Sequence, residues 1–114
     1  MYLQNKYSQW YCNIVDRAKS RALDGSFYTE KHHIVPRSLG GNNEKNNLVR
    51  LTGREHFICH WLLTKMTQGN AQHKMIYALR RMEHVSKYHQ GSRYVTRITS
   101  KVFDRNKKQW AKLH

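Results

Sequence analysis

Two pairs of histidines stand out among the eight histidines of this 114-residue sequence. His32 and His33 are neighbours, whereas His56 and His60 lie four residues apart. If the second pair is helical, its side chains lie on one face of the helix, one turn apart. Two imidazoles at that spacing can bind one divalent ion, and a ligand from a neighbouring strand can complete the protein's share of the site. The spacing therefore predicts a metal centre, and the alternative is histidines placed on the surface by chance.

The helical pair differs from the zinc-peptidase motif. In that motif a glutamate directly follows the first histidine, but here Phe57 follows His56. Glu55 precedes His56 and stands three residues after Thr52, which is the spacing of a capping box. We therefore expect Glu55 to be structural, and a zinc peptidase is a poor interpretation.

The elements that would hold these histidines are short. Aromatic and apolar residues recur at helical spacing over residues 2–23, which predicts an amphipathic helix. Residues 26–30 are β-prone and run into 31–36, where Pro36 should end the strand. A polar loop rich in Gly and Asn follows, and 48–51 is the second strand candidate.

Helices are expected after the second strand. The capping box predicts a helix that runs to about Met66, and an apolar stripe predicts another over 71–88. The tail over 97–114 has the pattern of a strongly basic helix. We thus expect one domain over residues 1–114 with an α+β, mostly helical fold, in which a ββα core is flanked by N- and C-terminal helices.

The charge balance points to a polyanionic partner. Twenty-one Lys and Arg residues stand against seven Asp and Glu residues, and the formal net charge is +14. Nucleic acid is the commonest partner of such a chain, although ribosomal proteins, toxins and antimicrobial chains are also basic. Contacts to phosphate position DNA without reading its sequence. The candidates for such contacts are Arg37, Arg50, Arg54, Lys101, Arg105, Lys107, Lys108 and Lys112.

Several other classes fit poorly. Cys12 and Cys59 have no CxxC spacing, so a disulfide framework and a four-cysteine zinc site are not expected, and both thiols should be reduced and part-buried. No apolar run approaches the roughly 20 residues of a membrane span, and the N-terminal residues lack a signal-peptide pattern. Trp61 and the two leucines after it should pack on the N-terminal helix, with Trp10 and Tyr11 as partners. We expect a soluble, cytoplasmic protein with no membrane partner.

The histidines belong to a longer pattern. It consists of HHIVP at 32–36, GG at 40–41, NLV at 47–49, REH at 54–56 and CH at 59–60. This pattern resembles the signature of HNH (ββα-metal) endonucleases. The sequence around it is similar to that of freestanding bacteriophage enzymes, many of them homing-type. The similarity extends over most of the chain. The resemblance implies a ββα-metal core over 27–66 and hydrolysis of DNA phosphodiester bonds.

The resemblance also implies a role for individual residues. His32, His56 and His60 would be the ligands of one divalent metal ion, with Mg²⁺ or Mn²⁺ expected and Zn²⁺ or Ni²⁺ possible. His33 would be the general base, and Asn47 would brace the loop that fixes it. The substrate would be double-stranded DNA, and the products would carry 5′-phosphate and 3′-hydroxyl ends. The enzyme would act as a monomer or a homodimer. Asn47 also has a simpler interpretation as an ordinary turn residue.

The chemistry of these groups agrees with such a reaction. A neutral imidazole with an ordinary pKa near 6.5 can take a proton from water at neutral pH. A single divalent ion can polarise the phosphate and stabilise the leaving oxygen. Two alternatives stay open at this point: a non-catalytic DNA-binding module whose histidines hold a structural zinc, and a basic HNH nuclease toxin.

Overall fold

The structure is a computed structural model that describes residues 2–22, 25 and 27–88, with side chains up to residue 83. Two strands and three helices make a mostly helical α+β fold, which confirms the predicted class and its small ββα core. The basic tail over 97–114 and its predicted DNA contacts, Lys101, Arg105, Lys107, Lys108 and Lys112, lie outside the described residues. The elements are α1 (Lys6–Ser20), β1 (Glu30–His33), η1 (Arg37–Leu39), η2 (Lys45–Asn47), β2 (Leu48–Leu51), α2 (Gly53–Lys65) and α3 (Gly69–Tyr88).

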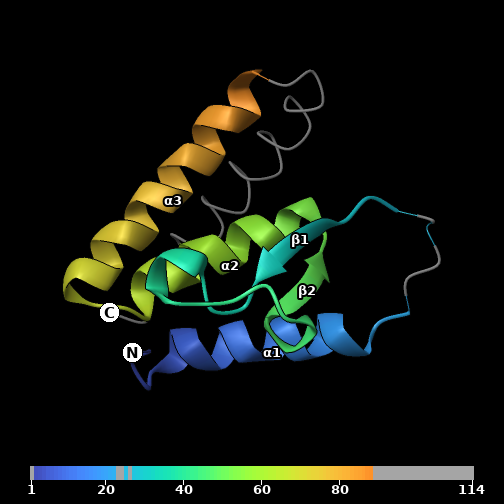
Figure 1. Cartoon of the computed structure of the whole chain (residues 1–114), viewed down its shortest axis with the longest axis horizontal. Helices are drawn as coiled ribbons and strands as arrows, with labels where there is room; N and C mark the ends of the chain where they lie inside the picture. The colour runs from blue at the N-terminus through green and yellow to red at the C-terminus, as the bar shows by residue number, and fades with distance from the viewer. Residues whose placement is uncertain (1, 23–24, 26, 89–114) are drawn as a thin grey trace.

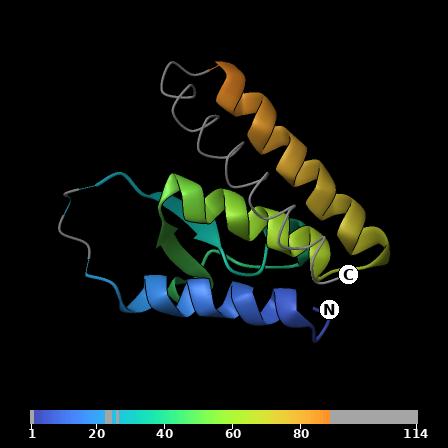
Figure 2. The ribbon, with the colours of Figure 1, turned by 180° about the vertical axis from the view of Figure 1, so that it is seen from behind.

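The helix α2 lies at the centre of the molecule. The helix α1 packs along one side of α2 and of the hairpin, and α3 crosses α2 on the other side (Figure 1). The view from behind shows the same three layers (Figure 2). The core between α1, α2 and the hairpin contains the buried side chains of Tyr11, Val15, Leu51, Leu62 and Met66, among others. The helices α1, α2 and α3 and the strand β2 all contribute to this core.

The two strands form an antiparallel hairpin. Its register pairs Lys31 with Arg50 and His32 with Val49. Successive side chains of a strand point to opposite faces. His32 and Val49 are buried on the face that packs on the helices, whereas Lys31 and Arg50 are exposed on the other face. Neighbouring residues of β1 consequently meet two different environments.

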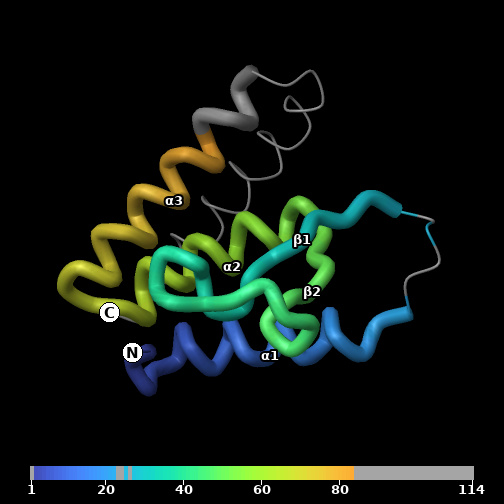
Figure 3. Tube along the Cα trace, in the orientation of Figure 1, coloured from blue at the N-terminus to red at the C-terminus, as the bar shows by residue number. Residues whose placement is uncertain are grey.

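The long connection between the strands is folded back on itself. Figure 3 traces it through the two short turns η1 and η2. Gly40 ends η1 with a φ of 95°, a left-handed conformation that favours glycine. Gly41 has a different reason to be glycine, because a Cβ there would collide with the carbonyl group of Val35. The predicted loop is thus an ordered segment.

The ends of the helices show where the sequence-based bounds were too wide. The helix α1 begins at Lys6, because Asn5 and Ser8 form a capping box, and it ends at Ser20. The expected helix over 2–23 is therefore shorter at both ends. The predicted capping box of Thr52 and Glu55 is present at the start of α2.

The aromatic packing partly matches the expectation. Trp61 packs on α1, where its ring meets Tyr7 at a centroid distance of 5.8 Å. Tyr11 instead meets His32 at 5.9 Å. Cys59 is buried and Cys12 is exposed, so the thiols are not both part-buried. Among the described residues, no helix combines the length and apolarity needed to span a membrane.

Candidate metal centre

Three histidines converge at the interface between the hairpin and α2. One ring nitrogen from each of His32, His56 and His60 lies within 4.8 Å of the others. His32 comes from β1 and is 1% exposed, whereas His56 and His60 come from successive turns of α2. The capping box fixes the residue at which α2 begins, and this sets the position of the two histidines of α2 relative to β1. The structure thus brings together the three residues that were predicted as ligands.

The hydroxyl group of Tyr11 determines which nitrogen of His32 is free. It donates its single hydrogen to the carbonyl oxygen of Ile34 at 2.6 Å. The same hydroxyl lies 2.8 Å from Nε2 of His32, and with its hydrogen already used it can only accept there. Nε2 must therefore carry the hydrogen, which leaves a lone pair on Nδ1. That Nδ1 atom is buried and has no hydrogen-bond partner.

A carboxylate orients His56 in the same way. Nδ1 of His56 lies 3.0 Å from Oε1 of Glu30, so Nδ1 carries a hydrogen, and the neutral form of this ring has its lone pair on Nε2. Glu30 is itself held by the hydroxyl of Tyr28, which donates to Oε2 at 2.9 Å. Glu30 and His32 are two residues apart on β1, so strand alternation directs both towards α2.

Burial and mutual repulsion keep two of the imidazoles neutral. Burial, helped by the nearby charges of His60, His56 and His33, lowers the pKa of His32 from 6.5 to about 2. Burial and the charge of His56 lower the pKa of His60 to about 4, although Glu30 opposes this shift. Both rings are therefore unprotonated at neutral pH, as metal ligands must be.

The donor set fits a divalent ion. Nε2 of His60 and Nε2 of His56 are 3.2 Å apart. Two nitrogens bound about 2.0–2.1 Å from one tetrahedral ion are roughly 3.3 Å apart. Without an ion or a shared proton, two facing lone pairs at this distance would repel each other. The unpartnered Nδ1 of His32 is the third donor, and imidazole suits Zn²⁺, Ni²⁺ and related ions.

His33 lies at the end of β1 and is turned to the other face of the strand. Its Nε2 is 2.7 Å from Oδ1 of Asn43, a residue of the connection between the strands. The amide oxygen can only accept, so Nε2 carries the hydrogen and Nδ1 keeps the lone pair that a base needs. His33 is half-buried and close enough to influence the pKa of His32. The predicted base therefore borders the three-histidine cluster without belonging to it.

Asn47 clamps the connection rather than His33 itself. Its Oδ1 accepts from the backbone nitrogen of Val35 at 2.8 Å, and its Nδ2 donates to the carbonyl oxygens of Val35 and Asn42 at 3.0 and 2.8 Å. Asn47 is 8% exposed, so these contacts are largely shielded from water. The clamp ties both ends of the segment that carries Asn43. This arrangement goes beyond an ordinary turn residue.

The predicted DNA contacts that the structure describes lie on three elements. Arg37 begins η1, Arg50 lies on β2 and Arg54 lies in the first turn of α2, and all three are exposed. Arg50 is held by Thr29, to whose Oγ1 and carbonyl oxygen it donates at 3.2 and 2.9 Å.

Glu55 has the structural role that its position predicts. Its Oε1 accepts from the backbone nitrogen of Thr52 at 2.8 Å, and both of its oxygens pair with Arg21 at 3.0 Å. Burial alone would raise the pKa of Glu55, but the hydrogen bonds from Arg21 and Thr52 hold it below the usual value. This pair joins the end of α1 to the start of α2.

Three residues of the site were not identified from the sequence. Glu30 could have been found, because strand alternation places it on the face of His32. Tyr11 gave only the signal of an aromatic core residue, and nothing in its spacing marks its hydroxyl. Asn43 stands among several asparagines that are equivalent by sequence.

The chain is similar to proteins of Enterobacteria phage T4 over about half of its length, and not over most of it as expected from the sequence. A protein named "probable mobile endonuclease D" is 56% identical over 63 residues, which is 53% of this chain and 24% of that protein. "Probable mobile endonuclease E" is 48% identical over 60 residues, 53% of this chain and 42% of that protein. "Probable mobile endonuclease B" is 44% identical over 63 residues, 53% of this chain and 24% of that protein.

These matches are partial on both sides. The chain spans about a quarter to two-fifths of the length of these curated relatives. No family model matches the chain. No solved structure matches it either.

Proposed function

We propose that this protein is a metal-dependent DNA endonuclease of the HNH type, related in role to phage mobile endonucleases. The observation that carries the proposal is the three-imidazole cluster with a separate, oriented histidine beside it. The named endonuclease relatives support the same class of reaction. A net charge of +14 suits a DNA substrate.

The number of donors favours a catalytic ion over a structural one. Structural zinc sites are closed by four protein ligands, whereas catalytic sites keep one position open. In the described part of the chain, the cluster is made of His32, His56 and His60 alone. This count supports a site with room for a water molecule or a phosphate oxygen.

Each residue of the candidate site has a defined role in this proposal. His33 accepts a proton at Nδ1 from a water molecule, whose oxygen attacks phosphorus as the bond to the 3′ oxygen breaks. A hydrogen bond to Asn43 keeps the ring of His33 in position, and Asn47 holds the segment of Asn43. A divalent ion on the three histidines would supply Lewis-acid stabilisation of the phosphate and of the leaving oxygen. The products carry a 5′-phosphate and a 3′-hydroxyl group.

The decisive experiment is cleavage of supercoiled plasmid by wild type and His33→Ala. Both proteins are assayed in EDTA, Mg²⁺, Mn²⁺, Ni²⁺ and Zn²⁺. The matched control is His73→Ala, a substitution of an exposed histidine on α3. We expect metal-dependent nicking or linearisation by wild type and by the control. His33→Ala should lose roughly 10²–10⁴ in rate while its DNA and metal affinities stay close to those of wild type.

Two results would contradict the proposal. Wild type that binds DNA but cleaves it with none of these ions would not be an endonuclease. If chelation also unfolded such a protein, the histidines would hold a structural zinc in a DNA-binding module. Cleavage that survives in His33→Ala would leave the nuclease intact and remove His33 as its base.

A further inference from the structure

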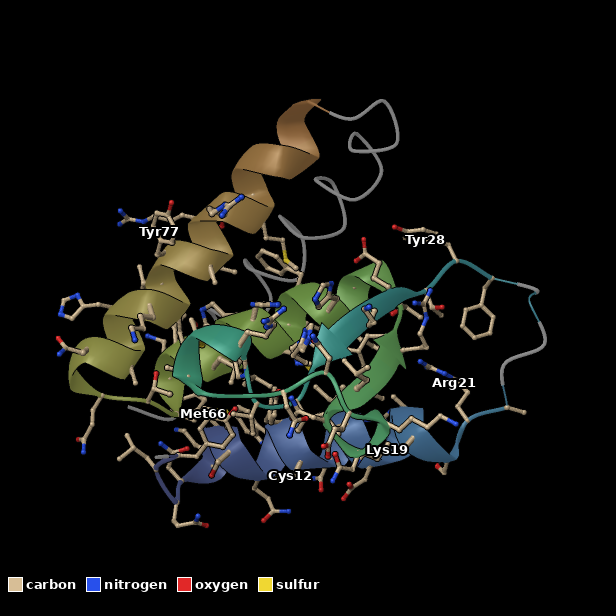
Figure 4. The ribbon with its side chains drawn as sticks, viewed as in Figure 1. Cys12, Lys19, Arg21, Tyr28, Met66 and Tyr77 are labelled. Carbon is tan, nitrogen blue, oxygen red and sulfur yellow. The ribbon has the colours of Figure 1, made fainter. Side chains whose placement is uncertain are left out.

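A basic groove borders the hairpin at the exposed side chains of Lys31 and Arg50. It runs between the end of α1 and β2, has a volume of about 610 Å³ and opens widely to solvent. Figure 4 shows Lys19 and Arg21 at the end of α1 that lies beside the hairpin. We call it the α1–β2 groove. Its cationic lining consists of Lys19, Arg21, Lys31, Lys45 and Arg50.

The positive charge of this groove is not balanced within the described part of the chain. Arg21 is paired with Glu55, but Lys19, Lys31 and Lys45 form no ion pair there. No acidic residue lines the groove. The unpaired positive charge therefore belongs to these three lysines and to Arg50, all of which line the same opening.

The hairpin register adds a further sign of an anionic ligand. Lys31 and Arg50 are directly opposite each other in the antiparallel ladder. Like charges at such positions are destabilising. Arg50 in addition donates two hydrogen bonds to Thr29, which hold its guanidinium group beside the start of β1. A negatively charged ligand would relieve this repulsion.

We propose that the α1–β2 groove binds the sugar–phosphate backbone of duplex DNA, beside the phosphate that is cut. This inference rests on the proposed endonuclease function and extends it to a binding surface. Lysine is a mobile point charge, and several of them around an open groove suit a row of phosphates better than a single small anion.

The groove and the proposed base share one strand face. Lys31 and His33 are two residues apart on β1, so their side chains leave the same face about 6.8 Å apart along the strand. One strand of B-DNA rises about 3.4 Å for each phosphate. A backbone that contacts Lys31 therefore has phosphates at a spacing that can also reach His33.

The test compares two triple variants with the same change in charge. The groove variant carries Lys19→Gln, Lys31→Gln and Lys45→Gln. The control variant carries Lys6→Gln, Lys65→Gln and Lys74→Gln. In the control, Lys6 lies in the first turn of α1 and Lys65 lies in the last turn of α2. These two helix ends are neighbours, because Asn5 donates a hydrogen bond to the carbonyl oxygen of Lys65. Lys6 and Lys19 are 13 residues apart on one helix, which is about 20 Å.

Affinity for duplex DNA is measured against salt from about 50 to 200 mM. Both sets of changes are made in the His33→Ala background with metal present, so that the duplex stays uncut, and circular dichroism checks folding. For the groove variant, we expect the slope of log K against log salt to become shallower by about 2.7, since each phosphate contact contributes roughly 0.9. The loss should be similar for duplexes of unrelated sequence, and the control should change the slope by much less.

Equal changes in the two triple variants would overturn the groove, because the effect would then be one of net charge. An unchanged slope in the groove variant would also overturn it, even if the wild-type chain cleaves plasmid. Conversely, a selective loss of slope in a protein that never cleaves DNA would keep the groove and remove the endonuclease. The two proposals can therefore fail separately.

Discussion

The two faces of β1 differ more than any two neighbouring surfaces of this protein. The inner face carries Glu30 and His32, which are held by Tyr28, Tyr11 and the histidines of α2. The outer face carries Lys31 and His33, and Lys31 has no ionic partner among the described residues. Alternation along four residues thus separates a hydrogen-bonded carboxylate and imidazole from a more exposed basic surface.

Under the proposed function, the difference reflects what each face would bind. A metal ion needs ligands at defined distances and in defined protonation states, and on the inner face Tyr11 and Glu30 fix the tautomers of His32 and His56. DNA phosphates are met by long side chains that can adjust, so the outer face needs charge more than geometry. Substitutions on either face test this difference, and their effects on metal affinity, stability and cleavage should be unequal.

The largest effect should follow the loss of a ligand on the inner face. His32→Ala removes one of three donors, and we expect the affinity for Zn²⁺ or Ni²⁺ to fall by more than about 100-fold, since loss of an outer partner alone costs roughly 10–100-fold. Titration calorimetry measures the affinity. Lys31→Gln, one residue away on the outer face, is the matched control and should leave metal affinity unchanged. Equal losses in both variants would show that the two faces are not independent.

Acid should lower the unfolding free energy of the metal-free protein, because it protonates the buried histidines near the inner face. Folding lowers the pKa of His32 and of His60 to about 2 and about 4, below their unfolded value of 6.5. Their contribution to stability is therefore complete above pH 6.5 and is lost as the pH falls towards these values. We expect a loss on the order of a few kcal/mol by about pH 4. Urea unfolding in EDTA between pH 7.5 and 4 measures it.

The control for the acid effect is a variant that removes one of the buried rings. His60→Gln should lose less stability between pH 7.5 and 4 than wild type, whereas His73→Gln, an exposed change, should follow wild type. A wild-type stability that stays flat over this range would contradict the burial of neutral imidazoles.

A smaller effect should separate the two tyrosines that meet at one carbonyl group. Tyr2 and Tyr11 both donate to the oxygen of Ile34, at 2.8 and 2.6 Å, but of these two hydroxyls only that of Tyr11 also contacts His32. Tyr11→Phe leaves Ile34 with Tyr2 as a donor and removes the acceptor for Nε2–H of His32. We expect about 10–100-fold weaker metal binding. Tyr2→Phe should leave the affinity close to that of wild type.

Nitrogen NMR of the imidazoles gives a readout of Tyr11 that does not depend on activity. In the metal-free wild type, His32 should show a hydrogen on Nε2 and a bare Nδ1. In Tyr11→Phe the two tautomers should mix. A fixed tautomer in both proteins would mean that Tyr11 packs against His32 without orienting it.

The sequence predicted the parts of this site that depend on local pattern. Helical spacing brought His56 and His60 together, and the capping box located the start of α2. The resemblance supplied His32 as the third member. Tyr11 escaped prediction because its contact with His32 spans 21 residues and depends on how α1 packs against the hairpin. Tertiary packing also decided which face of β1 is buried, a choice that the short strand left undetermined.

The smallest effect should arise on the outer face, from the residue that positions His33. Asn43→Ala removes the acceptor for Nε2–H of His33 and leaves Asn47 with all three of its hydrogen bonds, because these involve backbone groups of Val35 and Asn42. A single neutral hydrogen bond contributes about 0.5–1.5 kcal/mol. We therefore expect kcat for DNA cleavage to fall by about 2–10-fold, with KM and metal affinity unchanged, because the ring of His33 keeps its place but loses its fixed orientation. Ser38→Ala, an exposed change in the same connection, is the control. A fall in metal affinity with Asn43→Ala would mean that this side chain supports the inner face as well, and the division between the two faces would then be less sharp than the strand alternation indicates.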